Sequence, residues 1–299
     1  MHVFFSTAHS LPLPEGHRFP KEKYGLLRAR LISEEIIGQN ELRPSPMATR
    51  EDVLRVHSPE YVEGLEDGSI DPKVMRRIGF PWSSAIPTRG RVTVGGALAA
   101  ARAALRDGIS GQLAGGTHHA HRDFGSGFCI YNDLAVVAAT LLDSGEVDRV
   151  AIVDGDVHQG DGNAALLRER QDVYILDLFG EKNFPFRKVP SHHDVSLPDQ
   201  CEDDFYLSAL VENLPAVWAF KPDILLYQAG VDPLMSDHLG RMQLSFEGLM
   251  KRDHIVLDGA RQRGIPVSMA IGGGYAKPIE DTVVAYANTY VVAKQVFRV

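Results

Sequence analysis

The sequence predicts an α/β fold with a central, mainly parallel sheet and helices on both faces. Short apolar segments rich in β-branched residues, typical of buried strands, alternate along the chain with longer segments of helical periodicity. The predicted strands cover residues 1–6, a run ending at 113, and residues 150–153, 172–178, 223–230 and 266–271. No linker or repeat divides the 299 residues, of which 44% are hydrophobic, so we expect one domain over residues 1–299.

The predicted helices lie between these strands. Residues 21–37 have an amphipathic pattern, and residues 93–105 are rich in alanine. Ser58 followed by Pro59 is typical of a helix N-terminus, which predicts a helix through Leu65. Further helices are predicted over residues 132–142, 203–220, 245–263 and 277–292. Parallel strands joined by helices share one carboxyl edge, and α/β proteins bind their ligands there.

Composition and charge exclude several classes of function. The net charge of -8 argues against a general nucleic-acid binder, whose affinity depends on a basic surface. The two cysteines, Cys129 and Cys201, are too few for a disulfide framework and suit a reducing compartment. The N-terminal segment lacks the features of a secretory signal, and no apolar run is long enough to span a bilayer. We therefore expect a cytoplasmic protein without nucleic-acid or membrane partners.

Charged residues follow directly on one predicted strand, in the segment VAIVDGDVHQGDG at residues 150–162. Side chains two residues apart share a face of an extended chain, so Asp154, Asp156 and His158 would converge if the strand geometry continued. Buried carboxylates without partners are so costly that a cation or a histidine network is expected beside them.

Asp156 and His158, with Asp232 after the strand at 223–230, would supply two oxygen ligands and one nitrogen ligand. Three protein ligands with an open position are typical of catalytic zinc, although the same donors accommodate iron(II). An Asp-x-His pair alone is more often an ordinary hydrogen-bonded turn. The predicted position of Asp232 on the same sheet edge favours the metal site.

The glycine-rich segment GGTHHAHRDFGSGFCIYND contains His118 and His119, which by themselves could be satisfied loop residues. Asp154 and Asp161 remain as carboxylates outside the metal set. A carboxylate bonded to one imidazole nitrogen fixes the tautomer and leaves the other nitrogen for proton transfer. The sequence therefore predicts two His–Asp pairs for acid–base chemistry.

Two other features have a structural and a functional interpretation. Tyr275 follows three glycines, where it either packs as a core aromatic or directs its hydroxyl at developing oxyanion charge. The proline-rich segment of residues 11–20 is either a solvated connection or the wall of a pocket.

Four segments of the chain together resemble the zinc-dependent histone deacetylase family, which has the three-layer arginase/deacetylase fold. These segments are GGTHHAHRDFGSGFCIYND, VDGDVHQGDG, QAGVDPLMSD and IGGGY. The similarity extends from HSLP and ATREDVLRVHSPEY to GGGYAK, almost the whole chain. It is closest to class IV, because Gln159 replaces a histidine, Asp177 replaces a serine, and LGRMQLSFEGLMKRD also matches that class.

The resemblance implies a role for each candidate residue. It implies zinc held by Asp156, His158 and Asp232. It also implies His118 and His119 as the acid–base pair supported by Asp154 and Asp161, with Tyr275 as the carbonyl polariser. Gly127, through its carbonyl, and Phe128 would line an acyl-lysine channel. Potassium would occupy an inner site near Asp154, where Asp177 departs from the family pattern.

The activity implied is hydrolysis of an N-acyl amide, with acyl-lysine in a protein or peptide as the leading substrate. An alternative keeps the same site for a small acylated amine, as in bacterial-type amidohydrolases that act on acetylpolyamines. A third hypothesis is a catalytically silent binding module, which would be expected to lack a metal ligand or the tyrosine. None of these residues is missing here.

Overall fold

The computed structural model of the chain describes residues 1–6 and 11–299 and confirms the predicted fold class. In this part of the chain, eight strands form one sheet in the order β2-β1-β3-β8-β7-β4-β5-β6, and all neighbours are parallel. The strands are β1 (His2–Phe5), β2 (Leu42–Pro44), β3 (Ile109–Gln112), β4 (Val150–Asp154), β5 (Val173–Gly180), β6 (His193–Leu197), β7 (Ile224–Gln228) and β8 (Val267–Ala270).

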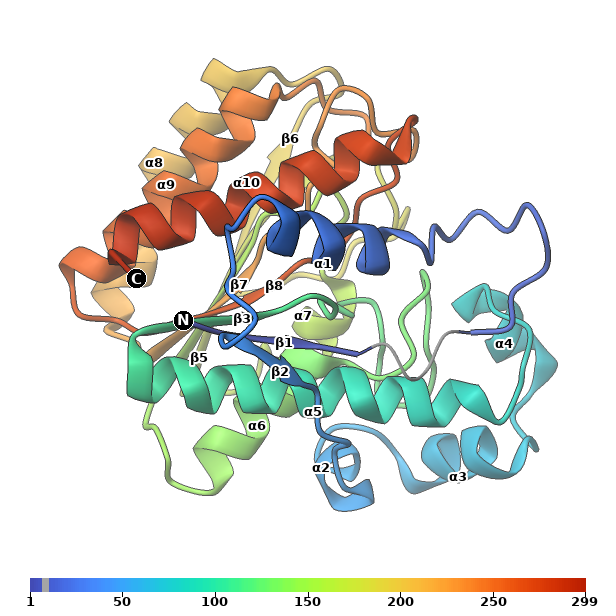
Figure 1. Cartoon of the computed structure of the whole chain (residues 1–299). Helices are drawn as coiled ribbons and strands as arrows, with labels where there is room; N and C mark the ends of the chain where they lie inside the picture. The colour runs from blue at the N-terminus through green and yellow to red at the C-terminus, as the bar shows by residue number, and fades with distance from the viewer. Residues whose placement is uncertain (7–10) are drawn as a thin grey trace.

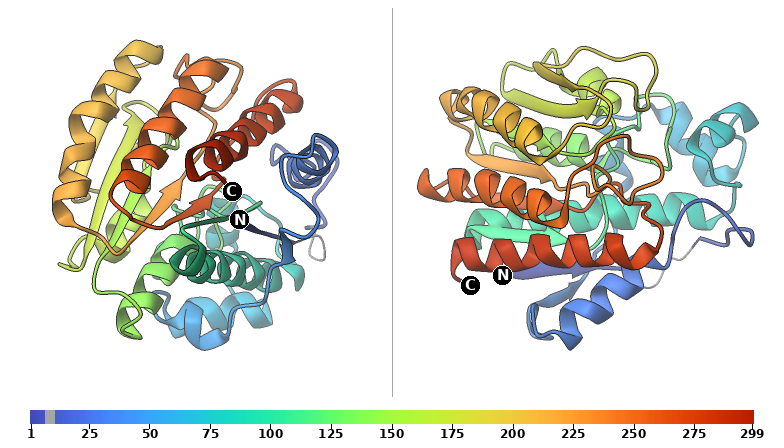
Figure 2. Two further views of the ribbon diagram at one scale, coloured as in Figure 1. Left: turned by 60° about the vertical axis from the view of Figure 1, so that its left-hand side comes forward. Right: turned by 90° about the horizontal axis from the view of Figure 1, so that it is seen from above.

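Helices cover both faces of the sheet, which gives three layers (Figures 1 and 2). One face packs against α5 and α6, and the other lies beneath α8, α9, α10 and α1. The helices are α1 (Lys23–Ser33), α2 (Arg50–Leu54), α3 (Pro59–Asp67), α4 (Pro72–Ile78), α5 (Ala85–Asp107), α6 (Asp133–Asp143), α7 (Asp161–Leu167), α8 (Asp203–Phe220), α9 (Phe246–Gln262) and α10 (Ile279–Phe297). No helix among the described residues is long and apolar enough to cross a membrane.

The central strands are buried throughout, which explains their continuous apolar sequences. Every residue of β3, β4, β7 and β8 is buried, as expected for parallel strands covered on both faces. The predicted strand at 150–153 is therefore confirmed as β4, with Asp154 as its last residue.

Side-chain caps fix where several helices begin. The predicted start of α3 is confirmed, since the hydroxyl of Ser58 accepts a hydrogen bond from the backbone N–H of Tyr61. Asn132 caps α6 and Ser245 caps α9 in the same manner. These caps place the preceding loops, because each one orients the chain that enters its helix.

The sequence analysis missed five short elements, namely α2, α4, α7, β2 and β6. Each has eight residues or fewer, too short for periodicity to be distinguished from loop sequence. The condition under which Asp154, Asp156 and His158 would share one face of an extended chain is not met, because β4 ends at Asp154 and a loop follows. The first two residues of the HSLP motif lie outside the described residues.

Candidate active site and metal centre

A cavity of about 630 Å³ opens beyond the carboxyl ends of the strands. Its lining includes His118 from the segment after β3, Asp156 from the segment after β4, and Tyr275 from the segment after β8. These strands lie close together in the sheet, so the topology brings their loops to one place. The segment of residues 11–20 contributes Arg18 and Phe19 to the wall, which agrees with the pocket interpretation of that segment.

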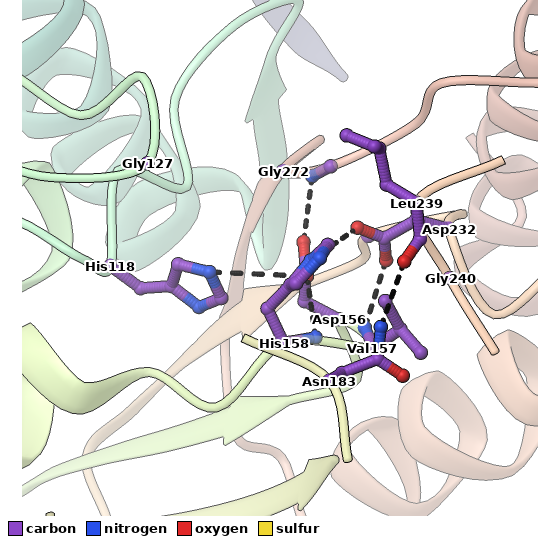
Figure 3. A network of polar contacts seen from close by, with 12 residues as sticks. His118, Gly127, Asp156, Val157, His158, Asn183, Asp232, Leu239, Gly240 and Gly272 are labelled. Atoms are coloured by element: carbon purple, nitrogen blue, oxygen red, sulfur yellow. Dashed lines mark hydrogen bonds and ion pairs between the residues drawn. The ribbon is translucent and has the colours of Figure 1, made fainter. Parts of the chain in front are cut away.

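Asp156, His158 and Asp232 come together as a possible metal-binding set (Figure 3). Asp156 and His158 line the cavity, and we call this part of it the floor. One potential donor atom from each residue lies within 4.8 Å of the other two. Nδ1 of His158 is 3.0 Å from Oδ1 of Asp156 and 2.9 Å from Oδ2 of Asp232. The loop after β4 and the loop after β7 therefore present their donors to the same point.

Backbone hydrogen bonds fix the orientation of both carboxylates. Oδ2 of Asp156 accepts the N–H of Gly273 at 2.7 Å, and Oδ1 of Asp232 accepts the N–H of Val157 at 2.8 Å. The remaining oxygen of each carboxylate faces His158. A Cβ atom on Gly273 would lie 2.0 Å from Oδ2 of Asp232, so the glycine is required for this close approach.

The charges in this set favour a cation. Burial and the carboxylate of Asp156 raise the pKa of Asp232 to about 7. Burial opposes protonation of His158, but Asp232 and Asp156 outweigh it and raise the pKa of the imidazole to about 10. A divalent ion that displaces this proton would satisfy the carboxylates, and two oxygens with one imidazole nitrogen suit such an ion. The residues present therefore fit a metal site.

The two predicted His–Asp pairs are both formed. Nδ1 of His118 lies 2.8 Å from Oδ2 of Asp154, and Nδ1 of His119 lies 2.6 Å from Oδ1 of Asp161. Nε2 of His118 is 3.9 Å from Oδ1 of Asp156, which places this imidazole beside the metal-binding set. Both histidines are buried, with exposed fractions of 3% and 4%.

Asp161 is positioned by the start of α7, which docks against the histidine segment. The carbonyl of His118 accepts hydrogen bonds from the N–H groups of Gly162 and Asn163. The second carboxylate oxygen of Asp161 lies 2.9 Å from Nε2 of His121. One carboxylate thus contacts two imidazoles, and His121 is a partner that sequence reasoning did not assign.

The two buried imidazoles have opposite pKa shifts. Burial lowers the pKa of His118, but the carboxylates of Asp154 and Asp156 prevail and raise it to about 10. Burial and the neighbouring His118 cation lower the pKa of His119 to about 4, although Asp161 acts in the other direction. At neutral pH the pair therefore contains one protonated and one neutral imidazole.

Tyr275 lines the cavity and is held through its backbone. Its N–H donates to Oδ2 of Asp237 at 2.6 Å, and its carbonyl contacts Nδ1 of His238. Burial, together with the carboxylates of Asp232 and Asp156, raises the pKa of the phenol well above its usual value. The hydroxyl is therefore protonated at neutral pH and available as a donor.

Aromatic rings form the walls above this polar floor. Gly127 and Phe128 both line the cavity, and the ring of Phe128 lies 6.0 Å from that of Tyr275. Phe184, which sequence reasoning missed, packs edge to face on His119 at 4.9 Å. Gly127 has a φ of 52°, and a Cβ there would lie 2.7 Å from the His119 ring. The glycine lets the wall approach the histidine.

Arg252 lies behind the metal-binding set and was also missed. Its guanidinium donates to the carbonyls of Gly155 at 3.0 Å and Gly230 at 2.6 Å, which belong to the two loops that carry the metal ligands. It also pairs with Asp253, and both side chains are 1% exposed. A signal for Arg252 and Asp253 was present in the sequence. The two charged residues lie three and four positions after Leu249, within the stripe of α9 that is buried.

Two further buried charges support the glycine-rich loops. Nζ of Lys23 donates to the carbonyls of Gly272 and Gly274, both at 3.3 Å, on the loop that leads to Tyr275. Asp133 accepts hydrogen bonds from the backbone of Gly116 and Thr117 just before the histidines, so its carboxylate shapes that turn. The position of Asp133 at the end of a long motif gave only a weak signal.

Gln159 and Asp177 occupy buried positions beside the site. The amide of Gln159 donates to the carbonyl of Val189 at 2.8 Å and accepts the N–H of the same residue at 2.9 Å. Asp177 pairs in register with Asp154 on the adjacent strand, and one of its oxygens accepts the N–H of Gly160 at 2.8 Å. Burial and the charge of Asp154 raise the pKa of Asp177 well above its usual value.

Comparisons with known proteins show the family to which the chain belongs. The family model described as the histone deacetylase domain matches residues 17–293. An uncharacterized protein of Picosynechococcus sp. is 39% identical over 99% of both chains. The histone deacetylase-like amidohydrolase of Pseudomonas aeruginosa is 30% identical over 89% of this chain and 74% of its own length.

A crystal structure of an HDAC homolog complexed with SAHA superposes with a TM-score of 0.81. The match covers 99% of this chain and 88% of that one at 24% identity, and it shows that the fold is shared. Fold, site and relatives together define a deacetylase or amidohydrolase with a three-layer α/β architecture. The chain belongs to the histone deacetylase family.

Proposed function

We propose that this protein is a zinc-dependent hydrolase of N-acyl amides that acts on acyl-lysine. The observation that carries the proposal is the gathering of three potential metal ligands, two His–Asp pairs and a protonated tyrosine around one cavity, with His118, His119, Asp156, His158 and Tyr275 in its lining. A histone deacetylase-like amidohydrolase among the relatives supports this class of reaction. Aromatic walls formed by Phe128 and Phe184 suit the aliphatic part of a lysine side chain.

In the proposed reaction, Tyr275 donates a hydrogen bond to the acyl oxygen as negative charge develops there. Asp161 holds Nδ1 of His119, which leaves Nε2 to take a proton from the attacking water. Asp154 holds His118 in the same way, and His118 protonates the departing amine. A bound zinc ion, held by the metal-binding set, would supply Lewis acidity and lower the pKa of water.

Two finer assignments belong to the same proposal. Gln159 and Asp177 support placement in class IV, in which case longer acyl chains should be tested as well as acetyl. A potassium ion near Asp154 would lie beside Asp177, whose Oδ1 is buried and has no hydrogen-bond partner among the described residues. Potassium-dependent stability of the purified protein would support that inner site.

A turnover assay with a panel of substrates tests the proposal. The zinc-loaded protein should hydrolyse acetyl-lysine or longer acyl-lysine peptides faster than acetylpolyamines, and SAHA should inhibit it. If it hydrolyses only acetylpolyamines, the small-molecule alternative is correct. If it hydrolyses none of the panel and SAHA has no effect, the silent binding module is correct.

A tyrosine variant tests the assigned role. Tyr275→Phe should lower kcat by about a hundredfold to a thousandfold, the usual effect of losing one donor to an oxyanion, while the zinc content stays unchanged. The matched control is Tyr174→Phe, because Tyr174 lies on β5 and does not line the cavity. Equal turnover by both variants would contradict the role of Tyr275.

A further inference from the structure

The mouth of the cavity is positively charged although the protein as a whole is acidic. Five exposed cationic side chains belong to its lining, namely Arg18, Arg76, Arg77, Lys182 and Arg241. The only carboxylate in the described lining is Asp156, which belongs to the metal-binding set at the floor. With a net charge of -8 for the whole chain, this concentration of cations departs from the average surface.

The cations come from separate segments that the fold brings to one opening. Arg76 and Arg77 lie in the last turn of α4, whose end is bonded to the channel wall. The carbonyl of Arg77 accepts the N–H of Gly127 at 3.2 Å, and the carbonyl of Ile78 accepts the N–H of Phe128 at 2.8 Å. The two arginines are therefore held next to the residues that line the channel.

Loops supply the remaining cations at the mouth. Arg18 precedes α1, Lys182 follows β5, and Arg241 lies between β7 and α9. Nδ2 of Asn183, next to Lys182, donates to the carbonyl of Leu239 at 2.9 Å. This bond joins the two loops that carry Lys182 and Arg241.

Few carboxylates compensate these charges. Asp199 lies 3.1 Å from Arg241 and 3.8 Å from Lys182, but it is not part of the lining. Among the described residues, Arg18, Arg76 and Arg77 have no carboxylate partner within ion-pair distance. The guanidinium of Arg77 instead stacks on the ring of Phe124 at 3.7 Å, which fixes it without neutralising it.

We propose that this mouth selects acyl-lysine residues that are flanked by acidic residues in a peptide or protein. The inference rests on the proposed function and specifies its substrate class. Cations around a concave opening attract carboxylates and raise the local concentration of an acidic substrate, and they repel a polyamine. Because the cations are exposed, salt weakens the preference by screening them.

Matched peptides provide the test. Three acetyl-lysine peptides of equal length, with flanking glutamates, serines or lysines, are compared with acetylspermidine on the zinc-loaded protein. We expect kcat/KM to fall by at least about tenfold from the glutamate to the lysine peptide at about 0.01 M salt, with most of the difference lost at about 1 M. Acetylspermidine should be the poorest substrate.

Charge-reversed variants locate the effect. The double variant Arg76→Glu with Arg77→Glu should remove or invert the preference, mainly through KM. Arg261→Glu is the matched control, because Arg261 is exposed at the end of α9 and does not line the cavity. This control should keep the preference of the unmodified protein.

Binding separates failure of this inference from failure of the proposed function. Anisotropy with labelled acetyl-lysine peptides is measured on the Tyr275→Phe protein. If peptides are hydrolysed without regard to flanking charge, or the lysine peptide is preferred, the inference is wrong and the proposed function stands. If no peptide is hydrolysed but the glutamate peptide binds more tightly than the lysine peptide, the cationic mouth stands and the proposed reaction is wrong.

Discussion

The floor and the mouth of the cavity are built in opposite ways. On the floor, Asp154, Asp156 and Asp232 are no more than 1% exposed, and each accepts a backbone N–H. At the mouth, exposed cations such as Arg76 and Arg241 extend from separate segments. Short contacts therefore determine the chemistry, whereas a longer-ranged and salt-sensitive field determines which substrates arrive. Substitutions at the floor should therefore cause large losses of turnover, whereas substitutions at the mouth should cause smaller, stepwise changes in kcat/KM.

The largest effect is expected from Asp232→Asn, which removes one charged donor from the metal-binding set. A catalytic metal contributes several kcal/mol, and each 1.36 kcal/mol is tenfold in rate, so turnover should fall by at least about a thousandfold. Metal content by emission spectrometry and turnover measure the outcome. Asp258→Asn on α9 is the control. An equal loss of turnover in both variants would show that Asp232 has no special role in turnover.

Arg252→Met tests whether the hydrogen bonds from Arg252 to the loops that carry the metal-binding set fix the position of its residues. The substitution leaves the buried carboxylate of Asp253 without a counter-charge, with the hydroxyls of Tyr227 and Thr289 as its remaining donors. The free energy of unfolding should therefore fall by about 3 to 5 kcal/mol. Loss of the bonds to Gly155 and Gly230 should also weaken metal affinity by about tenfold to a hundredfold, measured by chelator competition.

The control for that variant is Leu257→Ala, a buried truncation on the same helix that should cost about 2 to 5 kcal/mol. It should destabilise the protein without altering metal affinity. Equal metal affinity of both variants would show that Arg252 acts only on stability. Arg252→Lys, which keeps the charge, should recover part of the stability and less of the affinity.

The buried His57 predicts a pH dependence of stability. Burial lowers the pKa of this imidazole from 6.5 to about 4, and its Nε2 accepts the backbone N–H of Asn132. Because the folded pKa lies below the unfolded one, the stabilisation is complete above pH 6.5 and decreases as the pH falls toward 4. The difference between the unfolded and folded pKa of His57 corresponds to about 3 kcal/mol in the free energy of unfolding.

Urea unfolding at neutral pH and near pH 4 measures this effect. His57→Gln keeps a donor and an acceptor but does not titrate, so its free energy of unfolding should decrease less over the same pH range. The same decrease in both proteins would assign the acid sensitivity to other groups. Turnover of the two proteins at neutral pH should remain similar, since His57 does not line the cavity.

The smallest effect is expected from Phe186→Ala. Phe186 is 87% exposed at the mouth, and an exposed side chain of this kind contributes about 0.5 kcal/mol or less. We therefore expect kcat/KM to change by less than about threefold for the serine peptide. A loss of a hundredfold would show that an apolar contact, in addition to the field of the cations, determines selection at the mouth.

The floor could be predicted from the sequence because local rules apply there. Apolar runs predicted the strands, and the rule that loops meet at the carboxyl edge of a parallel sheet placed Asp156 and Asp232 together. The resemblance to a known family supplied an expected role for each residue, which stays a prediction. An extended path through His158 was one way in which these side chains could converge, and the structure instead brings them together by loop turns after β4.

The mouth and the support behind the floor could not be predicted in this way. Arg18, Arg76 and Arg241 lie in separate parts of the sequence, and no local pattern indicates that they share one opening. A charged residue on an amphipathic helix is usually solvated, so the helical spacing of Arg252 from Leu249 was only a weak sign of its burial. Such features depend on tertiary contacts that are distant in sequence.

The paired hydrogen bonds of Gln159 connect the two regions. Its side-chain amide donates one hydrogen bond to the backbone of Val189 and accepts one from it, as a peptide group of an adjacent strand does. Val189 lies at the end of the segment from Lys182, which contains Phe184. Gln159 directly follows His158 in the chain. Displacement of this segment would therefore break two hydrogen bonds to Gln159. Gln159 thereby joins a segment that contributes to the cavity lining to the part of the chain that carries a candidate metal ligand.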